Sequence, residues 1–221
     1  MSTSVGAALG DLLAGTLAEA EVLAPGALLL RGFARDEAAA LVAAVTQVAA
    51  AAPLRQMITP GGYRMSVAMT NCGAAGWVTD RAGYRYAPLD PLSERPWPAM
   101  PEIFRDLAGR AADAAGFADF TPDACLINHY EPGARLSLHQ DKDERDYSEP
   151  IVSVSLGLAA MFLWGGLRRS DRPRRLLIES GDVAVWGGPS RFTFHGIAPL
   201  TEGEHPLTGS ARINLTLRKA L

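Results

Sequence analysis

The second half of the chain is a series of short β-type runs with no helical pattern between them. Turn residues such as Pro132-Gly133, Gly165-Gly166 and Gly181-Asp182 separate the runs. Many short strands at this spacing are typical of antiparallel proteins that close into a barrel or a double-sheet jelly roll. The runs are ACLINHY, IVSVSLGL, MFLWG, RLLIE, DVAVW, RFTFHG and ARINLTLR, all after residue 123. The sequence therefore predicts an antiparallel barrel or a double-sheet jelly roll over residues 123–221.

Two helices are predicted before this core. DEAAALVAAVTQVAAAA begins at a candidate cap, Asp36, and is followed by Pro53,. PEIFRDLAGRAADAAG has Gly116 as its candidate terminator,. Each helix carries one apolar stripe, so each should pack against the core. The stripes are Leu41, Val45 and Val48 in the first helix, and Ile103, Phe104 and Leu107 in the second.

The segment between the helices is rich in Gly, Pro and aromatic residues, and only RMSVAM alternates like a strand. A long irregular segment in a compact domain is usually a lid or a binding loop. We therefore expect a single mostly β domain of the α+β class, spanning residues 1–221. Its parts are an N-terminal extension and helix at 1–52, a substrate-recognition lid at 53–98, a helix at 99–122 and the jelly-roll core at 123–221.

Composition indicates a globular protein of a reducing compartment. The hydrophobic content of 48% is enough for a real core,. Cys72 and Cys125 are too few for a disulfide framework and lack zinc-site spacing,. The N-terminus has no Lys or Arg before Arg31, and no apolar run approaches the roughly 18 residues of a membrane span,. We expect a cytoplasmic monomer without a membrane segment, and the net charge of −3 excludes a general basic surface,.

The charge run HQDKDERD, residues 139–146, is the first candidate site. A calcium loop of the EF-hand type needs Gly at its sixth position and Glu at its twelfth. Counted from Asp141, those positions are Asp146 and Val152, so the calcium interpretation fails. On extended backbone His139 and Asp141 face the same side and can bind one metal ion. The pair alone is weak evidence, because such a spacing also arises by chance.

His195 is the best third ligand, because it ends the run RFTFHG and precedes Gly196. Two histidines and one carboxylate make the facial triad of non-haem Fe(II) oxygenases, which leaves open coordination positions. The alternative is that His195 is an ordinary hydrogen-bonded histidine. Of the other two histidines, His205 lies in a polar turn, and His129 faces away from its strand neighbours,.

The last run, ARINLTLR, has a polar face and an apolar face. Buried arginines need an anionic partner, and guanidinium binds carboxylate in a bidentate manner. A dicarboxylate such as 2-oxoglutarate would satisfy both arginines, whereas a strand with exposed arginines is the open alternative. The polar face holds Arg212, Asn214, Thr216 and Arg218, and Asn128 and Tyr130 have the same two-residue spacing on another strand,.

Several ordered motifs resemble the AlkB family of Fe(II)/2-oxoglutarate-dependent nucleic-acid dealkylases, and the resemblance implies a double-stranded β-helix, or jelly-roll, core. They are RQMITPGGYRMSVAMTNCGAAGW, GYRYAPLDP, LINHYEPGARLSLHQDKDE, IVSVSLGL, GDVAVWGGPSRFTFHGI and RINLTLR. Long motifs in the same order are far more specific than one His-x-Asp pair. The sequence departs from the bacterial pattern at His129, where an Arg is usual, and at Ile213 and Leu217, where aromatic residues are usual.

The resemblance implies a role for each candidate residue. The iron ligands are expected at His139, Asp141 and His195, and the 2-oxoglutarate pocket at Asn128, Tyr130, Arg212, Asn214 and Arg218. Arg212 is expected at the distal carboxylate and Arg218 near the end that chelates iron. Trp77 matches the aromatic residue that stacks on a flipped base opposite His139, with a buried core tryptophan as the alternative. Met65, Tyr84 and Asp143 match further substrate contacts.

The resemblance also implies a reaction. Fe(II), 2-oxoglutarate and O2 would oxidise an N-alkyl carbon, with release of succinate, CO2 and formaldehyde. The substrates would be alkylated single- or double-stranded DNA, with RNA left open, and lesions such as 1-methyladenine and 3-methylcytosine. These lesions are cationic, so Asp141 and Asp143 would favour them over neutral bases.

The basic run RRSDRPRR is the best local site for a nucleic-acid backbone, and Arg169 is its first candidate,. Lys142, Glu144, Arg145 and Asp146 are expected to form a solvated loop. Two alternatives to the dealkylase stay open. One is an oxygenase of the same chemistry acting on a protein or a small molecule, and the other is a metal-binding jelly-roll module without redox activity.

Overall fold

A computed structural model describes residues 19–221, and strands dominate it. The strands are β1 (Ala20–Ala24), β2 (Ala27–Leu30), β3 (Arg55–Ile58), β4 (Arg64–Gly73), β5 (Gly76–Asp80), β6 (Gly83–Ala87), β7 (Ala124–Tyr130), β8 (Leu136–His139), β9 (Ile151–Gly157), β10 (Ala160–Trp164), β11 (Arg174–Ile178), β12 (Val183–Trp186), β13 (His195–Ile197) and β14 (Arg212–Arg218). The helices are α1 (Ala38–Ala51), α2 (Glu102–Ala114) and the short 3-10 turn η1 (Gly188–Ser190). Residues 1–18, part of the predicted N-terminal extension, lie outside the described residues.

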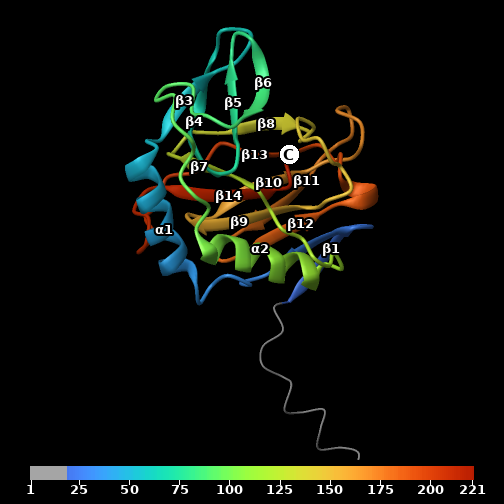
Figure 1. Cartoon of the computed structure of the whole chain (residues 1–221). Helices are drawn as coiled ribbons and strands as arrows, with labels where there is room; N and C mark the ends of the chain where they lie inside the picture. The colour runs from blue at the N-terminus through green and yellow to red at the C-terminus, as the bar shows by residue number, and fades with distance from the viewer. Residues whose placement is uncertain (1–18) are drawn as a thin grey trace, which may run out of the picture.

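Two antiparallel sheets form the body of the molecule. The larger has the order β1-β2-β12-β9-β14-β7-β4-β3 and the smaller the order β11-β10-β13-β8. The pair β5–β6 forms a separate hairpin that stands above β8 (Figure 1). The predicted jelly roll is confirmed, and its strand order brings segments far apart in sequence into contact.

The central strand β14 shows why this sequence forms a sheet with two different faces. It pairs with β7 on one side and β9 on the other. Ile213, Leu215 and Leu217 belong to the apolar cluster under the helices, whereas Arg212 and Arg218 line a cavity on the opposite face. The alternation predicted from ARINLTLR is therefore confirmed, because successive side chains of a strand point to opposite faces.

The helices α1 and α2 cover the outer face of the larger sheet (Figure 1). Leu41, Val45 and Val48 of α1 are buried in the same cluster as Phe104 and Leu107 of α2. Burial of one such side chain contributes about 1.5–3 kcal/mol. Both predicted helices are confirmed.

The predicted helix ends are partly right. The N-cap of α1 is Glu37, without a side-chain cap bond, so the predicted cap at Asp36 is wrong. The helix α2 is followed by Gly116 with φ of +84°, as its glycine indicated, because a left-handed residue ends a helix at little cost,.

Several strands were not predicted. Residues 20–30 form β1 and β2, and β2 pairs with β12 at the edge of the larger sheet. The segment 53–98 is less irregular than expected, because β3 and β4 extend the larger sheet beyond β7. His195 begins β13, since residues 191–192 form a turn and residues 193–194 are irregular, and the prediction that it ends a strand is wrong.

Within residues 19–221 no helix is long and apolar enough to cross a membrane.

Candidate active site

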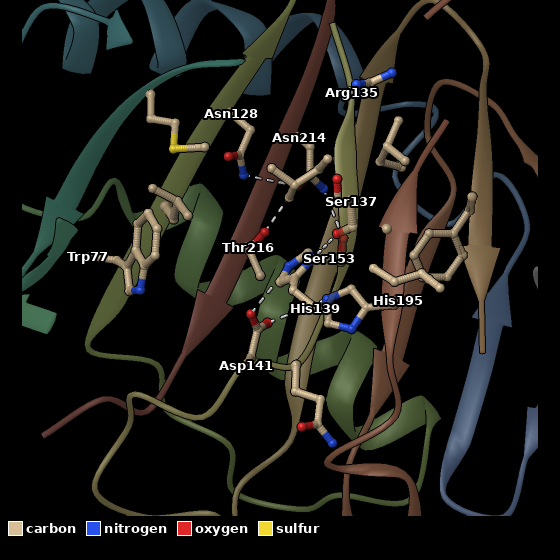
Figure 2. Close-up of a pocket in the computed structure, with 18 of the residues that line it drawn as sticks. Trp77, Asn128, Arg135, Ser137, His139, Asp141, Ser153, His195, Asn214 and Thr216 are labelled. Carbon is tan, nitrogen blue, oxygen red and sulfur yellow. Dashed lines mark hydrogen bonds and ion pairs between the residues drawn. The ribbon is translucent and has the colours of Figure 1, made fainter. Parts of the chain in front are cut away.

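A cavity of about 860 Å³ lies between the facing sides of the two sheets and opens beneath the β5–β6 hairpin. Its polar side chains come from β7, β8, β9, β13 and β14 and converge on one region (Figure 2). Every predicted site residue lines this cavity: Met65, Trp77, Tyr84, Asn128, Tyr130, His139, Asp141, Asp143, Arg169, His195, Arg212, Asn214 and Arg218.

His139, Asp141 and His195 form a compact cluster at the cavity wall (Figure 2). His139 ends β8 and lies opposite His195 in the β8–β13 pairing, and Asp141 follows two residues later. Nε2 of each histidine lies 3.7 Å from an Asp141 carboxylate oxygen. The ligand atoms of all three lie within 4.8 Å of one another, so a single metal ion can contact all of them.

Backbone carbonyls fix which ring nitrogen of each histidine faces the metal position. Nδ1 of His139 lies 2.8 Å from the Ser137 carbonyl, and Nδ1 of His195 lies 3.0 Å from the Thr193 carbonyl. A carbonyl only accepts, so each Nδ1 carries the proton and each Nε2 keeps its lone pair for a metal. Burial, aided by the nearby His139, lowers the pKa of His195 to about 4. His195 is therefore neutral, as a metal ligand must be.

Asp141 is ionised in this setting. Burial alone would raise its pKa, but the charge and hydrogen bond of Arg218 together with the two neighbouring histidines outweigh burial, and the pKa of Asp141 lies well below its usual range. Nη2 of Arg218 donates to Oδ2 of Asp141 at 2.6 Å. Two neutral imidazoles and one carboxylate are the donor set of non-haem Fe(II) oxygenases, so these residues fit iron.

Arg212 is a buried cation without an anionic partner among the described residues. Its side chain is almost fully buried beside the Tyr130 ring, whose centroid lies 4.9 Å from Cζ. Nη2 donates to Ser155 Oγ at 3.1 Å, whereas Nε and Nη1 have no hydrogen-bond partner. A buried guanidinium in this state is costly unless an anion binds to it. A carboxylate of 2-oxoglutarate would supply that anion.

Neutral polar groups lie between Arg212 and the metal position. Asn128 Nδ2 donates to Asn214 Oδ1 at 3.2 Å, and Thr216 donates to the same oxygen at 3.0 Å. Asn214 Nδ2 donates to Ser153 Oγ at 2.8 Å. Ser153 and Ser155 were missed in the sequence, although their spacing of two residues in IVSVSLGL is the signal that would have indicated them,.

The β5–β6 hairpin contributes an aromatic surface at the mouth of the cavity. The rings of Trp77 and Tyr84 stack with centroids 5.6 Å apart and an interplanar angle of 16°. Trp77 Nε1 donates to Oδ2 of Asp143 at 2.7 Å. Trp77 is half-buried and faces the cavity, so the alternative of a buried core tryptophan is wrong.

The arginines of the basic run 168–175 do not all lie at the cavity. Of its arginines only Arg169 lines the cavity, with Cζ 6.0 Å from the Phe194 ring centroid. Arg174 instead donates to Glu21 at 3.1 Å. The choice of Arg169 as the first candidate therefore agrees with its position.

Glu144 corrects one prediction, because it is buried rather than solvated. Its Oε2 lies 3.1 Å from Nη2 of Arg191, and its Oε1 lies 3.2 Å from Nε of Arg218. Arg191 was also missed, because nothing local indicates a partner 47 residues away. Lys142, Arg145 and Asp146 are exposed, as predicted for a solvated loop.

Comparisons with known proteins agree with this geometry. The family model of the 2OG-Fe(II) oxygenase superfamily matches residues 26–218. The chain is 60% identical over 210 residues to the Alpha-ketoglutarate-dependent dioxygenase AlkB of Escherichia coli (strain K12), covering 95% of this chain and 97% of that protein. It is 36% identical over 132 residues to the Nucleic acid dioxygenase ALKBH1 of Homo sapiens, covering 58% of this chain and 33% of that protein. The structure of OsALKBH1 superposes with a TM-score of 0.80 at 29% identity and covers 91% of this chain and 100% of that one.

These matches decide between the open alternatives for the chemistry. The 2OG-Fe(II) oxygenase model matches nearly the whole chain, and the site has both an iron-type triad and a buried arginine, Arg212, with unsatisfied donors for a cosubstrate. These findings exclude a metal-binding module without redox activity. The chain belongs to the AlkB family within the 2OG-Fe(II) oxygenase superfamily and is a 2-oxoglutarate-dependent dioxygenase that uses Fe(II).

Proposed function

We propose that this dioxygenase removes N-alkyl groups from bases of DNA, and of RNA as a second substrate. One observation carries the proposal: the Trp77 ring lies across the cavity from the His139 cluster (Figure 2), and the Asp143 carboxylate, which lines the same cavity, accepts a hydrogen bond from Trp77. A flat cationic base fits between such groups, because its ring stacks and its charge is balanced. The name of the human relative, a nucleic acid dioxygenase, supports the same substrate class.

The proposed roles follow the chemistry of the groups. His139, Asp141 and His195 hold Fe(II). Arg212 and Arg218 bind the two ends of 2-oxoglutarate, with Asn128, Tyr130 and Asn214 as neutral contacts. When bound, iron, 2-oxoglutarate and O2 supply the oxidation of the N-alkyl carbon, which gives succinate, CO2 and formaldehyde.

Substrate entry requires a base outside the stack, which costs a few kcal/mol and less for a damaged base. Stacking on Trp77 would offset about 1–3 kcal/mol of that cost. Tyr84 extends the aromatic surface toward solvent, since it is 49% exposed. Met65 contributes an apolar contact at the same mouth, and Arg169 a cation for a phosphate,.

The acids would select the lesion. 1-Methyladenine and 3-methylcytosine carry positive charge, whereas the normal bases are neutral. Asp143 is half-buried and lines the cavity, so a cationic base gains a coulombic attraction that a neutral base lacks,. This coulombic attraction would make the enzyme act on damaged, cationic bases in preference to normal bases.

Cellular location and assembly stay predictions. The cysteines Cys72 and Cys125 are free and buried, which supports a reducing compartment such as the cytoplasm,. The enzyme is expected to act as a monomer on single- or double-stranded nucleic acid.

The test is a demethylation assay. Oligonucleotides of DNA and of RNA, each with one methylated base, are incubated with the protein, Fe(II), 2-oxoglutarate and O2. Their masses are then measured by mass spectrometry. We expect loss of one methyl group and equimolar succinate. If 2-oxoglutarate is consumed without loss of a methyl group from any oligonucleotide, the substrate is a protein or a small molecule, and the dealkylase proposal is wrong.

A further inference from the structure

Tyr86 links the β5–β6 hairpin, here called the recognition hairpin, to the metal site. It lies on β6 directly opposite Trp77 on β5, and the hairpin stands above the strand that carries His139 (Figure 1). The Tyr86 hydroxyl donates to Oε1 of Glu144 at 3.0 Å. Burial raises the pKa of Tyr86, so the hydroxyl keeps its proton and remains a donor. The two aromatic residues of this cross-strand pair thus contact successive acids, Asp143 and Glu144.

Glu144 is held from a second side by Arg191. The two side chains are only 2% and 3% exposed, and Nη2 of Arg191 lies 3.1 Å from Oε2 of Glu144. Nη1 of Arg191 also donates to the main-chain oxygen of Asp141 at 2.8 Å, and Nε to that of Glu149 at 3.2 Å. Arg191 therefore fixes both the Glu144 side chain and the backbone of a proposed iron ligand.

Arg218 is the group on which these contacts converge. Its guanidinium contacts Oδ2 of Asp141 at 2.6 Å, lies 3.2 Å from Glu144, and donates from Nη1 to the Tyr86 hydroxyl at 3.3 Å. A divalent metal would draw charge from Asp141 and weaken its attraction for Arg218. Glu144 lies outside the ligand cluster, so its attraction for Arg218 would remain when the metal binds.

We propose that Glu144 and Tyr86 are positioning residues that keep Arg218 directed at the iron-proximal end of 2-oxoglutarate while Asp141 ligates the metal. This inference rests on the proposed roles of Arg218 and Asp141. It also gives the recognition hairpin a share in cosubstrate binding, because Tyr86 is part of that hairpin. Among the described residues, the row Arg191, Glu144, Arg218 and Asp141 alternates in sign, so each buried charge has an opposite neighbour.

A purely structural ion-pair row is the competing explanation. Buried ion pairs contribute little net stability, since desolvation offsets most of the attraction. A structural role would change the melting temperature alone. A positioning role would change the affinity for 2-oxoglutarate, and these two outcomes can be measured separately.

The first test is Tyr86→Phe, which removes one hydroxyl and keeps the ring. Tyr147→Phe is the matched control, because its hydroxyl donates at 2.8 Å to the Lys142 carbonyl in the same loop, and it is exposed. Binding of 2-oxoglutarate to the Fe(II)-loaded protein is measured without oxygen, from the visible charge-transfer band of the complex. Binding to the Mn(II)-loaded protein is measured by calorimetry. We expect about 3- to 10-fold weaker binding for Tyr86→Phe, from the loss of one hydrogen bond in a charged network, and no change for Tyr147→Phe.

The second test is Glu144→Gln, which keeps the shape and removes the charge. We expect a larger loss of 2-oxoglutarate affinity and a shifted charge-transfer band. The double variant with Tyr86→Phe and Glu144→Gln should lose less binding free energy for 2-oxoglutarate than the sum of the two single losses, because both residues act through Arg218. Should Glu144→Gln fail to fold, Tyr86→Phe still decides the question.

In steady state, the KM for 2-oxoglutarate should rise in Tyr86→Phe while the KM for the oligonucleotide stays unchanged. Wild-type affinity and an unchanged band in Tyr86→Phe would overturn the inference, whatever the melting temperature does. So would a change confined to the KM for the oligonucleotide. The binding measurements need no dealkylation, so failure of the proposed substrate and failure of this inference give different results.

Discussion

Trp77 Nε1 donates to Oδ2 of Asp143 at 2.7 Å. The ring proposed to stack on the base is therefore hydrogen-bonded to the acid proposed to select cationic bases. The bond joins the β5–β6 hairpin to the loop after β8, across 66 residues of sequence. A base that stacks on Trp77 can contact the other oxygen of Asp143, because a carboxylate has two acceptor oxygens. A cationic base then gains attraction from the charge of Asp143, whereas a neutral base does not.

Asp143→Asn should lower the preference for cationic over neutral lesions by about 5- to 10-fold, as expected for loss of roughly 1 kcal/mol of screened attraction. Asparagine keeps a carbonyl oxygen for Trp77, so the hairpin contact survives and only the charge is lost. The measurement is the ratio of kcat/KM for 1-methyladenine to that for 3-methylthymine, a neutral lesion. Asp143→Ala removes both charge and contact. A ratio that is unchanged in both variants would contradict the charge-selection hypothesis.

His139→Ala should abolish turnover and leave the fold intact. The His139 side chain is 34% exposed at the end of β8, so its removal opens no large internal cavity. The Fe(II) affinity should fall by more than about 100-fold, since a first ligand matters more than its outer partners, which cost about 10–100-fold. The control is His205→Ala, because His205 lies in a turn outside the cavity. Activity retained by His139→Ala would exclude the proposed triad.

The local sequence was enough to predict much of the fold and two of the three residues of the metal cluster. Alternation in ARINLTLR predicted which side chains of β14 face the cavity, because that pattern depends only on backbone geometry,. The ligands His139 and Asp141 are also a local pattern. His195 was chosen because few histidines exist, and the β8–β13 pairing that brings it opposite His139 is a long-range property.

Long-range pairing explains what the sequence did not indicate. AEVLA and ALLL have no strand alternation, and they form β1 and β2 because β2 pairs with β12. Glu144 looks solvated within a run of charges, and only Arg191, from a distant segment, makes its burial tolerable,. Such tertiary contacts override local preference.

Arg212→Met should separate cosubstrate binding from stability. Nε and Nη1 of Arg212 are buried without partners, so removing the charge should raise the free energy of unfolding of the ligand-free protein by about 1–3 kcal/mol,. The KM for 2-oxoglutarate should rise about 100-fold, as expected for loss of a bidentate charged contact. Thermal melts with and without 2-oxoglutarate check both effects, because added ligand should no longer stabilise the variant.

The comparison with Arg212→Lys sharpens this test. Lysine restores the charge but not the planar pair of donors, so we expect partial recovery of binding and none of the gain in stability. A ligand-free Arg212→Met protein that is less stable than wild type would mean that the guanidinium is satisfied inside the protein, and the anion-site interpretation would then fail.

Arg169→Ala should weaken nucleic-acid binding without changing which lesion is preferred. Arg169 lines the mouth of the cavity and lies over Phe194, where a phosphate beside a flipped base would pass. Loss of one phosphate contact should reduce the slope of log affinity against log salt concentration by about 1, with little change in the ratio of lesion to normal-base affinity. Fluorescence anisotropy of labelled oligonucleotides at several salt concentrations measures both. Arg105→Ala is the control, because Arg105 is exposed on α2, which packs on the opposite face of the larger sheet. Equal salt slopes for the two variants would show that Arg169 is an ordinary surface residue.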